Sequence, residues 1–143
     1  MSLAVAGPGF LLQHSAHSAG VFTTVSEVKD IAGPPQTLEK DEVTNQSSPN
    51  FYKEWITTLI DGGEVTFSCN YIPGDATQNS ATGLLSWLQG RGIQDWQIVP
   101  PSPNAARIIA FSGFVTHWEP KFAVAKAAQL DIKITVTGAV TVA

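Results

Sequence analysis

Residues 130–142 read Leu130-Asp131-Ile132-Lys133-Ile134-Thr135-Val136-Thr137-Gly138-Ala139-Val140-Thr141-Val142. From position 130 to position 137, apolar residues occupy the even positions and polar residues the odd ones. Side chains alternate between the two faces of a β-strand, whereas a helix repeats every 3.6 residues, so the pattern predicts a strand. This strand is longer than the usual ~5–6 residues and has one polar face, which suits an antiparallel sheet facing solvent or an aqueous lumen.

Four further segments predict strands upstream of this one. Residues 64–72 alternate in the same way, and residues 107–118 are apolar at both odd and even positions, as expected for a strand covered on both faces. Residues 93–99 and 21–31 complete the set, the latter with a bulge near Val28, where the alternation shifts. The chain is therefore expected to be mainly β.

One α-helix is predicted among these strands, at about residues 76–89. Asp75 followed by Gln78 resembles a capping box, apolar residues then recur at helical spacing, and Gly90 stands where a helix commonly ends. We expect the helix to lie on the sheet, with Trp87 outside its apolar stripe and protruding toward a neighbouring subunit.

The least regular parts of the sequence are residues 1–20 and 36–62. The first is small, apolar and punctuated by glycine, and is expected to be an extended arm with one short strand at residues 10–13. The second is expected to be a long loop that contains a short helix, because Ser48-Pro49 resembles a helix start. The apolar residues on one stripe of that predicted helix are Phe51, Trp55 and Leu59. So long a loop is unusual inside a compact domain, which suggests a contact role.

The composition favours a single domain, residues 1–143, that assembles with other subunits. Only 14% of the 143 residues are charged, against about 25% in ordinary soluble domains. Because interface cores are depleted in charge, a sparsely charged surface indicates subunit contacts. The formal net charge is −4 and the basic residues are scattered, so the chain as a whole is not expected to bind nucleic acid electrostatically.

The sequence also predicts the compartment. It contains one cysteine, Cys69, which excludes an internal disulfide and fits a reducing environment. Its N-terminus lacks the basic region of a signal peptide, and no apolar run approaches the ~18 residues of a membrane helix. We therefore expect a protein made and folded in a cytoplasm, without a membrane partner.

No motif predicts catalysis, a cofactor or a metal. No serine lies in a GxSxG pattern and no glycine run resembles a phosphate-binding loop, so the chain is not expected to be an enzyme. The histidines and the cysteine lack the spacing of zinc ligands. Tryptophans form binding platforms for sugars in some proteins, but their even spread through this apolar chain favours packing in the core or at an interface.

Several segments, in their order and spacing, resemble the tail tube proteins of long-tailed phages of the lambda type. These segments are VFTTVSEVKDIAGP (21–34), FYKEWI (51–56), DGGEVTF (61–67), NYIPGD (70–75), WQI (96–98), FSGFVT (111–116) and IKITVTG (132–138). Together they span roughly residues 9–142.

This resemblance implies an antiparallel β-sandwich or barrel-like subunit with one flanking helix. Such subunits form hexameric rings that stack into the tail tube of a siphovirus virion, the conduit for DNA ejection. The partners implied are further copies of the chain and the tape measure, tail terminator and distal tail proteins, with DNA as transient cargo in the lumen and assembly in the host cytoplasm. A type VI secretion-like tube protein and a carbohydrate- or receptor-binding β-domain of a phage tail remain as alternatives.

The resemblance also suggests where the two working surfaces lie. The residues expected to face the lumen are Asp131, Lys133, Thr135 and Thr137, with the strand expected at residues 21–31 as the alternative. Those expected to contact a neighbouring ring or subunit are Leu38, Asp41, Val43, Phe51, Trp55 and Trp87. A polar lumen suits passing DNA, because clusters of Lys and Arg would hold its phosphates.

Overall fold

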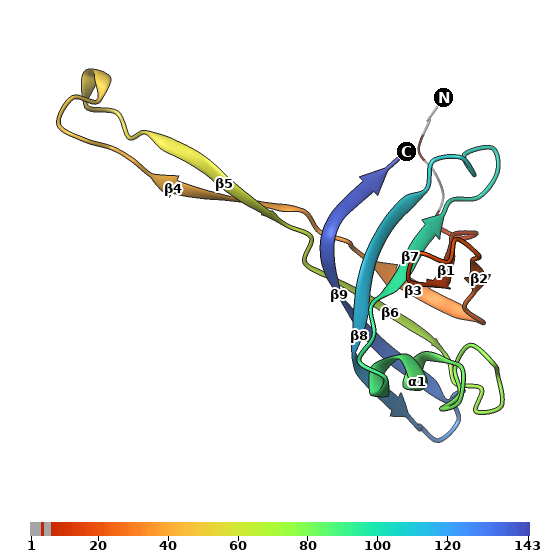
Figure 1. The fold of residues 1–143 in the computed structure, drawn as a ribbon. Coiled ribbons are helices and arrows are strands. Elements are labelled where there is room, and N and C mark those ends of the chain that lie inside the picture. The colour runs from red at the N-terminus through yellow and green to blue at the C-terminus, as the bar shows by residue number, and fades with distance from the viewer. Residues whose placement is uncertain (1–3, 5–6) are drawn as a thin grey trace.

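The computed structural model describes residue 4 and residues 7–143, which fold mainly into antiparallel strands (Figure 1). In chain order the elements are β1 (Leu11–Ala16), β2 (Thr23–Thr24), β3 (Val28–Ala32), β4 (Thr37–Glu42), the 3₁₀ turn η1 (Pro49–Phe51), β5 (Trp55–Asp61), β6 (Glu64–Asn70), α1 (Leu84–Gln89), β7 (Gln94–Val99), β8 (Ile109–Lys121) and β9 (Gln129–Val142). The predicted mainly β fold with a flanking helix is confirmed. In the part of the chain that the structure describes, no helix has the length and the apolar character that a membrane span requires.

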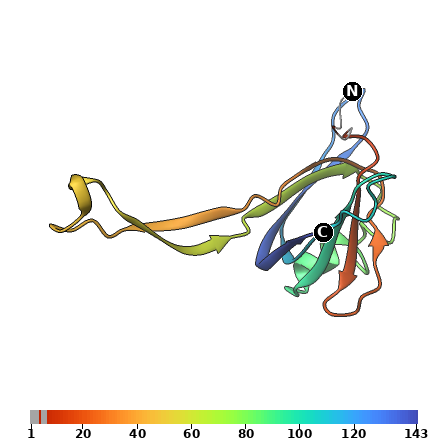
Figure 2. The same cartoon turned by 90° about the horizontal axis from the view of Figure 1, so that it is seen from above.

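Seven strands form one sheet in the order β2-β1-β7-β8-β9-β6-β3, and this sheet curls so that its two edges approach each other (Figures 1 and 2). Only residues 25–27 separate edge strand β2 from edge strand β3. The Val25 N–H donates to Leu12 O of β1 at 2.9 Å, and the Asn70 N–H of β6 donates to Glu27 O at 3.1 Å. This short segment therefore links both sides of the sheet, which gives the body its barrel-like shape.

The hydrophobic core fills the inside of the curled sheet. Strand β9 faces it with its even-numbered residues up to Val136, as its alternation predicts. The side chains that are most fully buried include Leu12, Val65, Trp96, Leu130, Ile134 and Leu84 of α1. At the open seam between the N-terminal segment, β3 and β7, a cavity of about 790 Å³ remains beside Phe10, Ile31 and Ile98.

Two predictions about the N-terminal third are wrong. The short strand expected at residues 10–13 is present as β1, but it is not part of an extended arm, because β1 pairs with β2 on one side and β7 on the other. Residues 21–31 are not one bulged strand, because the chain turns at Glu27, whose φ is 52°, and changes partner from β1 to β6. The shift of alternation at Val28 therefore marks a change of partner strand.

The predicted helix at 76–89 is present only as α1, residues 84–89. Upstream of α1, the carboxylate of Asp75 and the side-chain amide oxygen of Asn79 accept hydrogen bonds from backbone N–H groups two or three residues later. These side-chain hydrogen bonds compete with helix formation. Gln78 is buried and does not cap a helix. Its side chain instead accepts from the Ile72 N–H and donates to Ser26 O and Asn70 O, which ties three segments together.

Candidate assembly surfaces

Strands β4 and β5 form a hairpin, residues 37–61, that projects away from the body (Figures 1 and 2). The prediction of a loop with a short helix over 36–62 is therefore wrong, and Ser48-Pro49 leads only into the 3₁₀ turn η1. Every residue of both strands is exposed. The neighbouring cross-strand pairs Asp41–Ile56 and Glu42–Trp55 lie on opposite faces, so apolar side chains occur on both faces and no two-residue alternation marks the segment.

The tip of the hairpin is ordered by side-chain hydrogen bonds. The Ser48 hydroxyl donates to Glu54 Oε2 at 2.7 Å and accepts from the Asn45 N–H at 3.0 Å. The Glu54 N–H in turn donates to Thr44 Oγ1 at 2.8 Å. Because this network holds the tip together, Phe51, which is 96% exposed, is presented to solvent on a defined structure.

The root of the hairpin is held tightly against the body by two glycines. Gly63 has a φ of +68°, and a β-carbon there would lie 2.6 Å from Pro35 Cγ. Its carbonyl accepts from the Val136 N–H at 3.0 Å, and its N–H donates to Asp61 Oδ1 at 2.9 Å. Gly62 is buried against Val136. These contacts fix the direction in which the hairpin leaves the sheet.

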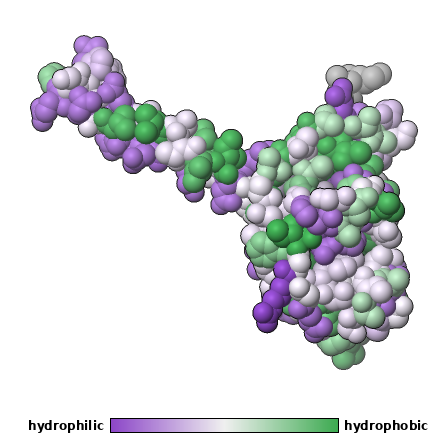
Figure 3. Space-filling model, viewed as in Figure 1, coloured by the Kyte–Doolittle hydropathy of each residue, from purple (hydrophilic) through white to green (hydrophobic). Residues whose placement is uncertain are grey.

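The hairpin carries an unusual share of the exposed apolar surface (Figure 3). Of the fifteen large hydrophobic side chains found exposed in the described residues, eight lie on it: Leu38, Val43, Phe51, Tyr52, Trp55, Ile56, Leu59 and Ile60. A lone two-stranded hairpin is marginally stable in water, and contiguous exposed apolar patches mark interaction sites. The hairpin is therefore a candidate interaction surface.

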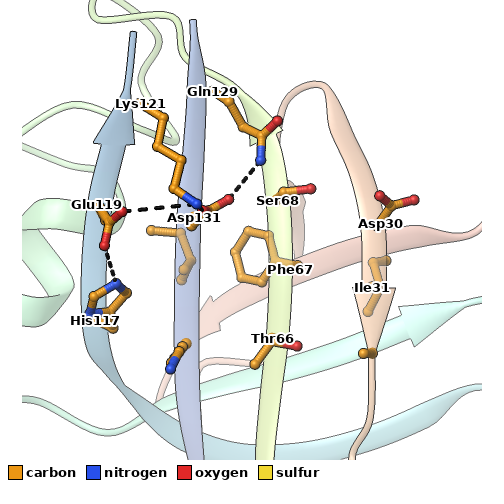
Figure 4. Close-up of a pocket in the computed structure, with 13 residues that line it drawn as sticks. Asp30, Ile31, Thr66, Phe67, Ser68, His117, Glu119, Lys121, Gln129 and Asp131 are labelled. Atoms are coloured by element: carbon orange, nitrogen blue, oxygen red, sulfur yellow. Dashed lines mark hydrogen bonds and ion pairs between the residues drawn. The ribbon is translucent and has the colours of Figure 1, made fainter. Parts of the chain in front are cut away.

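A second candidate surface is the outer face of β6, β9 and β8, where polar side chains follow one another across the strands. Register places Ser68 and Glu119 on either side of Asp131, and Thr66 and His117 on either side of Lys133. These residues line a shallow, open hollow of about 530 Å³ (Figure 4).

Ion pairs tie the charged groups of this face together. Lys121 Nζ lies 2.6 Å from Asp131 Oδ2 and 3.9 Å from Glu119 Oε1, and His117 Nε2 lies 3.2 Å from Glu119 Oε2 (Figure 4). The hydrogen bonds that Asp131 accepts from Lys121 and Gln129 hold the pKa of its carboxyl below the usual value. The hydrogen bond between Lys121 and Asp131 also raises the pKa of the Lys121 ammonium group. Its ammonium group is therefore already engaged, and among the lysines of β6, β8 and β9 only Lys133 has no ion pair.

The structure places the predicted contact residues in two different settings. Leu38, Asp41, Val43, Phe51 and Trp55 are all exposed on the hairpin, where the Lys40 ammonium lies 4.5 Å from the centre of the Trp55 ring. The expectation that Trp87 protrudes is wrong: its ring stacks on His14, with 3.4 Å between centroids, and packs edge-on against Trp96. Trp87 is thus part of the packing beneath α1.

The predicted lumen residues Asp131, Lys133, Thr135 and Thr137 share the outer face of β9, opposite its core face. Sequence reasoning did not single out as contact candidates four further apolar residues that are exposed on the same hairpin: Tyr52, Ile56, Leu59 and Ile60. The signal was present in the aromatic and β-branched run from Trp55 to Ile60, which is typical of strands.

The histidines, the cysteine and the tryptophans, which were considered as metal ligands or as a sugar platform, do not come together in one site. His14 packs on Trp87, His17 Nδ1 lies 2.9 Å from Asp95 Oδ1, and no group of His, Cys, Asp and Glu able to hold a metal occurs among the described residues. Burial raises the pKa of the Cys69 thiol to about 12. The tryptophans form no shared exposed platform, since Trp96 is fully buried and Trp87 is stacked.

Comparisons with known proteins agree with this geometry. A family model described as "Lambda phage tail tube protein, TTP" matches residues 13–143. No curated protein matches the sequence.

Solved structures with the same fold are distant in sequence. The tail of an empty GTA (gene transfer agent) particle, refined with C6 symmetry, superposes with a TM-score of 0.76 at 14% identity, covering 98% of this chain and 99% of that chain. The SPP1 tail tube superposes with a TM-score of 0.69 at 12% identity, covering 94% and 77%. A chain of the anti-feeding prophage baseplate superposes with a TM-score of 0.70 at 10% identity, covering 100% and 97%.

Proposed function

Because the chain belongs to the lambda phage tail tube protein family, we propose that six copies form a ring and that such rings stack through the hairpin, residues 37–61. The protein is a structural subunit of a phage tail tube and thus part of the virion. The hexameric ring is supported by the C6 symmetry of the GTA tail, whose subunit has the same fold. Assembly in the host cytoplasm, the absence of catalysis, and contacts with tape measure, terminator and distal tail proteins belong to the same proposal.

The observation that carries the proposal is the exposed apolar hairpin. A filament needs a surface on one subunit that fits a different surface on the next, because such heterologous contacts do not close on themselves. The hairpin stands clear of its own body and has a rigid root and an ordered tip, so it is able to reach another copy.

We propose that the outer face of β6, β9 and β8 lines the lumen and that DNA passes along it. The ion pairs of Lys121 leave few free cations on this face, so phosphates have little to bind. Joining such sheets between neighbouring copies would also leave no unpaired edge strand, which removes an aggregation hazard.

Deleting the hairpin tests the proposal. A variant in which Thr37 is joined to Asp61 by a short turn is expected to keep the β-sheet circular dichroism spectrum and a cooperative unfolding transition, and to form no tubes by negative-stain electron microscopy. Tubes at wild-type yield would refute the role of the hairpin.

A matched pair of point variants makes the same test without a deletion. Leu59 and Val21 are similarly exposed, at 71% and 74%, on the hairpin and on the body respectively. Leu59→Ser is expected to lower tube yield, whereas Val21→Ser leaves it unchanged, and both leave subunit stability within about 0.5 kcal/mol of wild type.

A further inference from the structure

The loop between β8 and β9, residues 122–128, presents a second exposed apolar surface. Val124 is 99% exposed and Phe122 is 73% exposed. The loop is nevertheless ordered: the Lys126 N–H donates to Ala123 O at 3.3 Å, and the Phe122 ring packs edge-on against Tyr71 with 6.0 Å between centroids. Two large apolar side chains are thus held toward solvent on a defined turn.

This loop and the hairpin have opposite charge. No acidic residue occurs between positions 120 and 130, whereas Lys121 and Lys126 flank the exposed apolar side chains. The Lys121 ammonium is paired with Asp131, while no ion pair of Lys126 is found within the described residues. The hairpin contains five acidic residues (Glu39, Asp41, Glu42, Glu54, Asp61) and two basic ones (Lys40, Lys53), a formal charge of −3.

The two surfaces also lie at different levels of the subunit. The hairpin root is bonded to Val136, in the second half of β9, whereas the loop ends where β9 begins, at Gln129. Seven residues of strand separate these points, roughly 23 Å at ~3.3 Å per residue. Figure 1 shows the loop at the lower end of the body and the hairpin leaving from higher up. Surfaces placed in this way are able to meet between stacked copies.

We propose that the β8–β9 loop is the docking site for the hairpin of a second copy of this chain in the neighbouring ring. Phe122 and Val124 cover apolar side chains of that hairpin, and Lys126 faces its acidic residues. Contact of an apolar centre with complementary charges at its edge is the usual organisation of a specific protein interface. The inference rests on the proposed function, since it requires stacked rings.

Cysteine cross-linking tests the contact directly, because the native Cys69 is buried and its raised pKa keeps it unreactive. Val124→Cys is combined in turn with Leu38→Cys, Phe51→Cys and Trp55→Cys, and assembled tubes are treated with a short bifunctional maleimide. The matched control combines Val21→Cys with the same three hairpin substitutions.

At least one hairpin position is expected to cross-link with position 124 and none with position 21. Because each subunit contacts one copy above and one below, denaturing gels are expected to show a covalent ladder that continues past six subunits. Well-formed tubes in which no hairpin position cross-links with position 124 would overturn the inference. A ladder that stops at six subunits would also overturn it, because the hairpin would then contact a copy in its own ring.

A charge reversal gives a second measurement that needs no cysteine. Lys126→Glu is expected to raise the protein concentration at which tubes form by about tenfold, and by less at high salt, because salt screens the repulsion. The control is Arg107→Glu, at an exposed position in the loop between β7 and β8. It is expected to leave the concentration at which tubes form unchanged. An unchanged threshold for Lys126→Glu overturns the inference. If the wild-type chain itself never forms tubes, it is the proposed function that fails.

Discussion

Gly62 lies so close to Val136 that a β-carbon at position 62 would stand 2.6 Å from Val136 Cγ1. This contact joins the hairpin to the strand whose outer face is proposed to line the lumen. The Val136 side chain is therefore one of the contacts that couple the direction of the hairpin to the position of this face.

Gly62→Ala is expected to destabilise the subunit by about 1–3 kcal/mol, since the added methyl group overpacks a buried contact. Chemical denaturation measures this loss, and electron microscopy is expected to show fewer or irregular tubes. Removing the opposing methyl groups with Val136→Ala in the same chain is expected to recover part of the loss, as a double-mutant cycle reveals. Additive losses would mean that the two residues do not restrain one another.

Thr137→Lys tests the lumen face. Thr137 pairs with Ser112 on β8, so no carboxylate lies directly opposite to neutralise a new lysine. In phage that carry the variant, tube yield is expected to stay normal, while DNA ejection slows because added cations hold phosphates. Thr137→Glu is the control and is expected to eject DNA normally. Equal ejection by the two variants would show that this face does not meet the DNA.

His14 is expected to make subunit stability depend on pH. Its ring is half-buried against Trp87, and this burial lowers the pKa of the imidazole in the folded state below its ordinary value of about 6.5. The unfolded chain therefore takes up a proton at a higher pH than the folded chain does, so stability is full above about pH 6.5 and falls as the pH drops below it.

Urea denaturation of the unassembled subunit at pH 7 and pH 5.5 measures this dependence. The wild-type chain is expected to lose more stability across that window than His14→Gln, which cannot titrate. Equal losses by the two proteins would show that His14 does not carry the effect.

The residues that were predicted well are those with a periodic pattern of burial. Strands β6 and β9 were expected within a few residues of their observed bounds, because a strand packed on a core shows its two-residue period directly in the sequence. The bounds of β7 and β8 were also expected within a few residues, but β8 is not covered on both faces as its apolar run predicted, because Phe114 and Thr116 are exposed on its outer face. In β8 the prediction ended early, at residue 118, yet the strand continues through Glu119 and Pro120 to Lys121 and carries the ion pairs of the polar face.

The predictions that failed concern segments whose structure depends on side chains far away or on surfaces with no core beneath them. The helix expected from Ala76 begins only at Leu84, because side-chain bonds from Asp75 and Asn79 replace its first turns. The candidate contact residues of the hairpin were identified correctly as exposed, but as parts of a loop and helix, because a hairpin with apolar residues on both faces has no period to recognise.

The sequence by itself determined that the chain is mainly β and which face of β9 is buried, because alternation is a local property of an extended backbone and needs no knowledge of the partner strands. Only the tertiary structure decided that residues 25–27 bridge the two sheet edges, and that residues 37–61 stand clear of the body as a hairpin. Both follow from long-range hydrogen bonds and from the close packing of Gly62 and Gly63 against Val136 and Pro35, which no local pattern records.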